Sequence, residues 1–352
     1  MKTFQRIFAA LAAAAAVAAV PSAARADANM PVPGSAGTGV TGFATDAFPG
    51  FDPDSWNVEQ KKPSFWFSVK RQTPAEQFEY ARTLARDGKY NAARKAYEAL
   101  VREWPETFEA ALSQEAIGSL WVTQLDDIYE AFEEYDYLLR FYPGLCKYAD
   151  VVSIQYKIAE MMYEEQKSKG FFSFTWTSQR SIRRKFERVI RYAPGAPHVP
   201  AAMMRVGELR REYGELEEAA LAYEGLCNRF PGTEAAEKAA FLRVEILMEL
   251  VRKHPSNRAR KVAAVNAFRR VVETYPANPR AAEVRSWIEE CEKAVEEAAW
   301  NDTVFYDTRQ RKPGAAIAAY ERYIEQYPGS ERAAAARARI EAIKGGAAPL
   351  RK

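Results

Sequence analysis

Six stretches of the chain end in the same way, and this repetition constrains the fold more than any other feature. Each stretch carries an aromatic residue eight positions before a proline, as in AYEALVREWP and AYERYIEQYP. An aliphatic pair that follows the aromatic, such as Leu100 and Val101, shares its helix face. Because proline cannot continue a helix, each stretch is predicted to be the second helix of a helical hairpin. The aromatics are Tyr97, Tyr135, Phe186, Tyr223, Phe268 and Tyr320, and the prolines are Pro105, Pro143, Pro194, Pro231, Pro276 and Pro328.

Small residues in the same helices support a repeated architecture. Ala92, Ala93 and Ala96 would allow two helices to approach closely. The pattern resembles the tetratricopeptide repeat, and the resemblance covers roughly residues 73–344. It implies an all-α fold, a tetratricopeptide-repeat superhelix of about six helical hairpins plus a capping helix, with a concave groove.

The first 26 residues have the composition of a signal peptide. Lys2 and Arg6 precede an apolar run, and small residues lead to a predicted cut after Ala26. A membrane anchor is the alternative, but a spanning helix needs roughly 20 apolar residues and the run is about 14 long. We therefore expect an exported protein of the periplasm, at or near the outer membrane of a Gram-negative-type bacterium.

Residues 27–72 are rich in Gly, Pro, Ser and Thr, and they are predicted to form an extended or disordered leader. Thr73, Pro74 and Glu76 form a capping signature that predicts a helix from Pro74 onward. The repeat domain is expected over residues 73–344, followed by a flexible tail at 345–352.

Charge argues against a nucleic-acid partner. The sequence has 50 basic and 47 acidic residues, and three of the basic residues but none of the acidic ones lie in the predicted signal peptide. The exported part is therefore formally neutral. A neutral chain does not provide the basic surface that nucleic-acid binding requires.

No constellation for catalysis is visible in the sequence. Its two histidines, His198 and His254, have no partner at metal-ligand spacing. Its three cysteines form no C-x-x-C pair, so buried small residues are expected rather than a disulfide or a reactive thiol. The acidic pair Glu133–Glu134 has basic neighbours and is predicted to lie on a solvated face. We therefore expect a protein that is not an enzyme and has no metal and no cofactor.

The stretch GFFSFTWTSQ, residues 170–179, is unusual for a connection between two helices. Its alternation of aromatic and small polar residues predicts an extended segment over residues 172–177. A short pairing with the similar SFWFSV at residues 64–69 is one alternative, and packing of the rings onto neighbouring repeats is another.

The insertion carries a second, more specific resemblance. Gly170, Phe171 and Phe172, followed by Arg180 and Ser181, are similar to the insertion of the BamD family of outer-membrane assembly lipoproteins. The family implies a periplasm-facing scaffold for the barrel-insertase complex, whose first repeats receive substrate segments and whose last repeats bind partner subunits. This chain has no cysteine directly after the apolar run and has six repeat endings where the family has five. Association with the membrane is therefore expected through partners rather than a lipid anchor.

Two other classes of function remain open beside the one that the resemblance implies. A periplasmic adaptor similar to the Tol-associated cell-division coordinator would have comparable repeats without needing the aromatic insertion. An enzyme would reveal itself by a bound metal or cofactor. The expected partners are envelope proteins, namely barrel-insertase subunits or unfolded outer-membrane protein segments.

Large aromatic residues of the insertion and of the first three repeats are the predicted contacts, because they supply contact area at small entropic cost. The competing interpretation is that most of them belong to the core between helices. An arginine-rich stretch from Arg180 to Arg191 is either a solvated face or a contact for an acidic partner or lipid headgroup. The predicted partner-binding residues are Phe171, Phe172, Phe174, Trp176, Tyr80, Tyr90, Trp121, Tyr129 and Tyr156.

Overall fold

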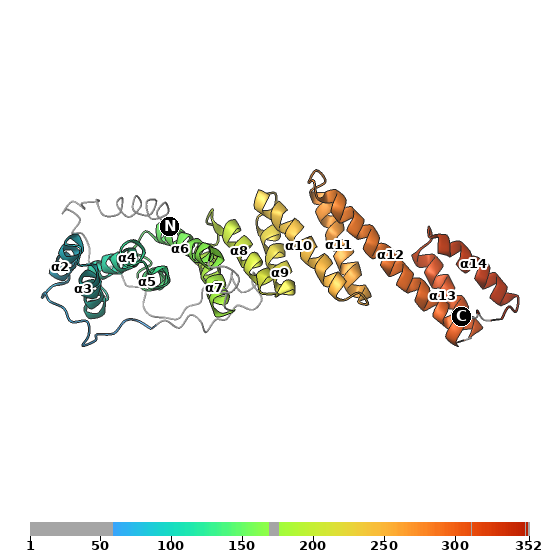
Figure 1. Cartoon of the computed structure of the whole chain (residues 1–352), viewed down its shortest axis with the longest axis horizontal. Helices are drawn as coiled ribbons and strands as arrows, with labels where there is room; N and C mark the ends of the chain where they lie inside the picture. The colour runs from blue at the N-terminus through green and yellow to red at the C-terminus, as the bar shows by residue number, and fades with distance from the viewer. Residues whose placement is uncertain (1–58, 169–175, 311, 349, 351–352) are drawn as a thin grey trace. The chain divides into compact units, whose positions relative to one another are not determined.

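The computed structural model of the chain describes residues 59–168, 176–310, 312–348 and 350, without the side chains of residues 176–178 and 310. The described chain divides into two compact units, Met1–Glu218 and Ala219–Lys352, and each is considered by itself. All regular elements in these ranges are helices, drawn in Figure 1, apart from an isolated bridge between Ser64 and Phe67. The all-α class predicted from the repeats is confirmed.

Unit 1 consists of helical hairpins, and each hairpin packs against the next one along the chain. Each helix from α2 to α7 contacts the next one along the chain, and α2 also contacts α4, the first helix of the following hairpin. The helices are α2 (Pro74–Arg86), α3 (Tyr90–Glu103), α4 (Phe108–Thr123), α5 (Ile128–Phe141), α6 (Tyr148–Ser168), α7 (Trp176–Tyr192) and α8 (Val199–Glu212). The boundary between the units falls within α9 (Leu216–Arg229).

Unit 2 continues the pattern of consecutive hairpins, with first helices of 20 residues in α10 and 25 residues in α12. Contacts again link consecutive elements, from α10 to α14. The elements are α10 (Glu234–Lys253), α11 (Arg258–Thr274), α12 (Ala281–Phe305), a π-helical turn η3 (Tyr306–Gln310), α13 (Pro313–Gln326) and α14 (Glu331–Lys344). The last helix occupies the place of the predicted cap.

Helix ends follow the chemistry that the sequence suggested. Each of the six second helices ends two residues before its proline, as α3 ends at Glu103 before Pro105. The residue next to the proline leaves the helical region, with φ −128° and ψ 60° at Trp104. At the other end of the first hairpin, the Thr73 hydroxyl accepts a hydrogen bond from the Glu76 amide, so α2 begins at Pro74 as predicted.

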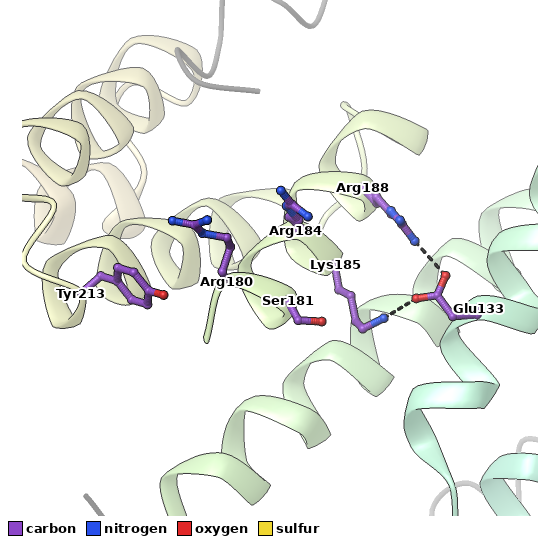
Figure 2. A pocket seen from close by; sticks show the side chains of 7 residues that line it. All are labelled: Glu133, Arg180, Ser181, Arg184, Lys185, Arg188 and Tyr213. Atoms are coloured by element: carbon purple, nitrogen blue, oxygen red, sulfur yellow. Dashed lines mark hydrogen bonds and ion pairs between the residues drawn. The ribbon is translucent and has the colours of Figure 1, made fainter. Parts of the chain in front are cut away.

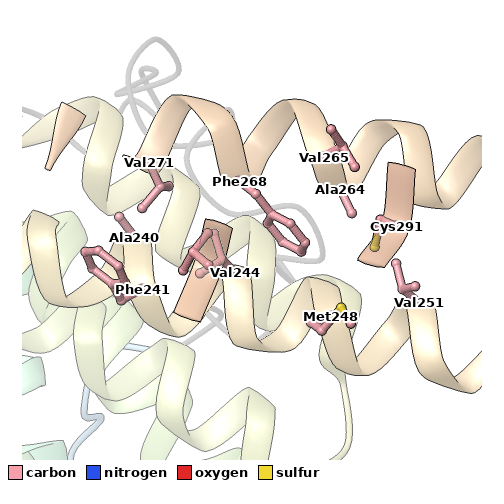
Figure 3. Packing of buried hydrophobic residues seen from close by; sticks show 11 residues of the cluster. Ala240, Phe241, Val244, Met248, Val251, Ala264, Val265, Phe268, Val271 and Cys291 are labelled. Carbon is pink, nitrogen blue, oxygen red and sulfur yellow. The ribbon is translucent and has the colours of Figure 1, made fainter. Parts of the chain in front are cut away.

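The core of unit 2 shows how the repeated aromatic works. Phe268 of α11 is completely buried in a cluster to which α10, α11 and α12 contribute (Figure 3). Val244 and Met248 of α10 and Cys291 of α12 lie in the same cluster. The remaining repeat aromatics, from Tyr97 to Tyr320, are buried as well. One aromatic per hairpin therefore fills the space between each second helix and its neighbours.

Candidate functional site

A hollow on the surface of unit 1 collects most of the arginine-rich stretch. Its lining is drawn in Figure 2, and we call it the cationic hollow. Arginines recur at every fourth position of α7 and so form a stripe along that helix, while Ile182 and Phe186 on another side of α7 are fully buried in the core. The lining residues are Glu133, Arg180, Ser181, Arg184, Lys185, Arg188 and Tyr213.

One carboxylate from α5 orders two of the cations. Glu133 Oε1 lies 2.5 Å from Lys185 Nζ, and its Oε2 lies 3.0 Å from Arg188 Nη1. Burial alone would raise the pKa of Glu133, but the charges and hydrogen bonds of Lys185 and Arg188 outweigh it and hold the pKa below its ordinary value. Glu133 is therefore ionised at neutral pH and keeps both cations in place.

The hollow retains an excess of positive charge. Among the described residues that line it, one is acidic, Glu133, and four are basic. Arg180 is exposed and makes no ion pair with any residue that the structure describes. Arginine offers a planar fork of donors that matches a carboxylate or phosphate in two hydrogen bonds. The hollow is chemically suited to an anionic group presented by another molecule.

A buried charge network fixes α7 against α5 behind the hollow. Asp136 of α5 is only 1% exposed, and its carboxylate lies 2.9 Å from Arg140 Nε and 3.6 Å from Arg188 Nη1. The Tyr192 hydroxyl of α7 donates a hydrogen bond of 2.7 Å to the same carboxylate. Arg188 thus belongs both to this network and to the hollow, so the two are structurally coupled.

The five predicted contact aromatics of the first three repeats are all half-buried, and four of them touch neighbours in their own chain. The Arg71 guanidinium lies 4.7 Å from the ring centroid of Tyr80, and that of Arg94 lies 5.0 Å from Trp121. The Tyr129 hydroxyl accepts a hydrogen bond of 3.3 Å from the Gln166 side chain.

Tyr156, the fourth, stacks on His198 with centroids 4.9 Å apart. Burial raises the pKa of Tyr156 and lowers that of His198. Tyr90, the fifth, begins α3. The five residues do not form one cluster: Tyr90, Trp121 and Tyr129 lie at the turns within hairpins, whereas Tyr80 and Tyr156 lie in the middle of first helices.

Most of the aromatic insertion lies outside the residues that the structure describes. Phe171, Phe172 and Phe174 lie outside the described residues, as does the side chain of Trp176. The backbone allows one correction. Helix α7 begins at Trp176, so the extended conformation predicted over residues 172–177 is wrong for Trp176 and Thr177.

A second correction concerns the acidic pair Glu133–Glu134, which was predicted to be solvated. Glu134 is largely buried, and its carboxylate lies 2.6 Å from Lys61 Nζ, a residue of the predicted leader. Lys61 Nζ also lies 2.8 Å from Glu98 of α3. Sequence reasoning missed this site, because a lone lysine ahead of the first repeat carries no signal of the carboxylates it will meet. The buried Asp136 was missed as well, although Asp136 and Arg140 have the i, i+4 spacing of a helical ion pair.

No group of three or more His, Cys, Asp or Glu side chains within the described residues is placed to hold a metal ion. The three cysteines are unpaired, and burial raises the pKa of each thiol, to about 11 for Cys146, which disfavours the nucleophilic thiolate. Among the described helices, none is both long and apolar enough to cross a membrane.

Solved structures with some similarity include MamA, at 15% identity over 60% of this chain and 94% of that chain, with a TM-score of 0.29. The C-terminal part of a TPR repeat-containing protein from Cytophaga hutchinsonii is 15% identical over 76% of this chain and 88% of that one, with a TM-score of 0.31. PilW, a type IV pilus biogenesis factor, is 14% identical over 75% and 98%, with a TM-score of 0.27. No curated protein matches this chain at a significant level.

The tetratricopeptide repeat profile matches residues 77–107, which cover most of the first hairpin, α2 and α3, so the repeat predicted from the sequence is confirmed. The YfiO profile, described as an outer membrane lipoprotein, matches residues 160–345, which begin within α6 and run through α14. This match covers more than half of the chain and includes the arginine stripe of the cationic hollow. The chain therefore belongs to the YfiO (BamD) family of outer membrane lipoproteins and is built from tetratricopeptide repeats.

Proposed function

We propose that this chain is a non-catalytic scaffold that binds other envelope proteins during the assembly of outer-membrane proteins. The observation that carries the proposal is the family match over residues 160–345, because the family is one of outer membrane lipoproteins. Helical repeat stacks expose long, rigid surfaces that are suited to binding proteins rather than small molecules.

Within this function, the cationic hollow is the proposed contact for acidic groups of a partner or client. Four basic side chains line the hollow, two of them paired with Glu133, and the buried Asp136 network holds α7 in position. Arginine side chains that are already ordered lose less conformational entropy when they bind a carboxylate. The aromatic residues Trp121 and Tyr129, at the turn between α4 and α5, would add apolar contact area in the same unit.

Partners are proposed to contribute to holding the protein at the membrane. The family description names lipoproteins, whereas the three cysteines of the sequence, Cys146, Cys227 and Cys291, all lie within the repeats. Binding to membrane-embedded subunits would keep the scaffold at the outer membrane whatever anchor it carries, because each additional contact raises the effective concentration of the others.

Affinity purification from detergent-solubilised cell envelopes tests the proposal. The wild-type chain should recover subunits of the barrel-insertion machinery, and Arg180→Glu should lower that recovery several-fold by reversing a charge in the hollow. Arg86→Glu, at an exposed arginine of α2 that lies outside both the hollow and the last repeats, is the matched control and should behave as wild type.

Two outcomes would contradict the proposal. Recovery of Tol components without the insertion machinery would favour the cell-division adaptor instead. Equal loss of partners in both arginine variants would mean that the hollow has no special part in binding.

A further inference from the structure

A tight turn just before the first repeat carries two solvent-exposed aromatic side chains. The Phe67 amide donates a hydrogen bond of 3.0 Å to the Ser64 carbonyl, which closes a turn with Phe65 and Trp66 at its tip. These two side chains are 92% and 83% exposed, more than any other large apolar residue that the structure describes. Their rings meet edge to face with centroids 5.9 Å apart. We call residues 64–67 the aromatic turn.

The chain leading into the aromatic turn is fastened to two second helices. The Lys61 amide donates a hydrogen bond of 3.0 Å to the Tyr137 hydroxyl. The Lys61 ammonium lies 2.8 Å from a carboxylate oxygen of Glu98 and 2.6 Å from one of Glu134. A charged group that is held by two largely buried carboxylates is costly to release. The position of the turn is thereby tied to α3 and α5.

The chain leaving the turn is fastened as well. The Arg102 guanidinium lies 4.7 Å from the ring centroid of Phe67 and so covers the third aromatic of the segment. Gln77 of α2 is fully buried, and its side-chain oxygen accepts hydrogen bonds of 2.9 and 3.1 Å from the amides of Lys70 and Arg71. Phe65 and Trp66 are therefore exposed on an ordered support, and their exposure is not the result of a loose chain end.

Basic side chains bracket the tip. Lys62, Lys70 and Arg71 are exposed on the two sides of the turn. The single acidic residue within the described part of this segment, residues 59–72, is Glu59, which forms an ion pair with Lys62 at the surface. Exposed aromatics with flanking Lys and Arg match the chemistry of a phospholipid surface, where rings sit at the headgroup level and cations meet phosphates.

We propose that the aromatic turn binds the surface of an anionic phospholipid bilayer, with Phe65 and Trp66 inserted among the headgroups. Lys62, Lys70 and Arg71 contact lipid phosphates in this arrangement. The inference rests on the proposed function, because that function places the protein beside the outer membrane. Since the turn is already ordered by α2, α3 and α5, binding costs little conformational entropy.

Co-sedimentation of the full chain with vesicles tests the proposal. Vesicles of phosphatidylethanolamine and phosphatidylglycerol should bind the wild type, and the double variant Phe65→Ser, Trp66→Ser should bind about tenfold more weakly, because two apolar side chains no longer leave water. Phe108→Ser removes an aromatic that is 52% exposed on α4 and is the matched control, with binding unchanged. Lys70→Glu should weaken binding to these vesicles and leave binding to pure phosphatidylcholine vesicles unaffected.

The controls separate this inference from the proposed function. The double variant should keep the melting temperature of the wild type, because both rings are in water, and it should recover the same partners from detergent. Equal vesicle binding by wild type and double variant would overturn the inference. Loss of partners in detergent with unchanged vesicle binding would also overturn it, since the turn would then be a protein contact. If the wild type binds vesicles through the turn but recovers no insertion machinery, the proposed function fails and the inference stands.

Discussion

The two units of the chain differ in the contacts that hold their helices together: buried polar and charged side chains are common in unit 1 and few in unit 2. Of the thirteen buried polar or charged residues that the structure describes, eleven lie in unit 1 and two in unit 2. In unit 1, Asp136, Arg188 and Tyr192 link α5 to α7, and Lys61 links the leader to α3 and α5. In unit 2, the apolar cluster around Phe268 joins α10, α11 and α12.

Buried charges and apolar packing respond differently to mutation and to pH. The stability that apolar packing provides depends little on pH and salt. The free energy lost when a buried side chain is truncated grows with the volume that is removed. A buried ion pair adds little net stability relative to an apolar pair, but removing one partner leaves an uncompensated charge. We therefore expect unit 1 to respond to charge and pH, and unit 2 to respond to side-chain volume. Unit 1 is also where the cationic hollow and the aromatic turn lie, so its charges are positioned where binding is proposed.

The largest effect is expected from Phe268→Ala. The side chain is completely buried, and its ring lies 6.1 Å from that of Trp287. Its removal should lower the free energy of unfolding of unit 2 by about 3–5 kcal/mol. Hydrogen exchange resolved by peptide is the measurement, because it reports each unit separately. Val262→Ala, on the exposed side of the same helix, should change stability by about 0.5 kcal/mol or less. Equal loss of protection in unit 1 would break the comparison.

A somewhat smaller effect is expected from Asp136→Asn in unit 1. The substitution keeps the shape of the side chain but leaves Arg140 and Arg188 without their buried carboxylate, at a cost of about 3 kcal/mol. Chemical denaturation and peptide-resolved exchange should both report it, with α5 and α7 losing protection first. Glu79→Gln, which removes an exposed ion pair with Arg82, should cost about 0.5 kcal/mol. A cost for Asp136→Asn no greater than that of its control would contradict the role of the network.

The smallest expected effect is a loss of folding stability at alkaline pH, caused by the ionisation of Tyr97. Burial raises the pKa of Tyr97 to about 12. In the unfolded chain the group titrates near its ordinary value of about 10. The contribution of Tyr97 is therefore fully present below pH 10 and is lost as pH rises toward 12, because the unfolded state gives up the proton first.

Tyr97→Phe isolates that contribution. Between pH 10 and pH 12 the wild type should lose about 2 kcal/mol more stability than the variant, while near pH 7 the two should differ by about 1 kcal/mol or less. Denaturation at a series of pH values is the measurement, with tyrosinate absorbance as a check on ionisation. Parallel stability curves for the two proteins would show that Tyr97 does not contribute to alkaline unfolding.

Much of the fold could be predicted from short-range patterns. The six prolines and the aromatics eight positions before them predict the second helices, and the ends of α3, α5, α7, α9, α11 and α13 confirm them. Thr73 and Pro74 predict the start of α2. These features act within a few residues of themselves, through backbone geometry and helix capping, so a sequence shows them directly.

The candidate sites could be predicted only in part. The arginine stripe of α7 is visible as a spacing of four, but Glu133, which orders Lys185 and Arg188, comes from another hairpin more than 50 residues away along the chain. Nothing near Lys61 indicates that it will meet Glu98 and Glu134. The aromatic turn was noted as part of SFWFSV, but its exposure depends on where Arg102 and Gln77 hold the chain.

The sequence by itself determined that this chain forms stacked helical hairpins and where each second helix stops, because proline geometry and helical periodicity are local properties. Only the tertiary structure decided which charges are buried together and which aromatics remain in water. Those outcomes depend on the distances between side chains of different hairpins, which the packing of helix on helix sets.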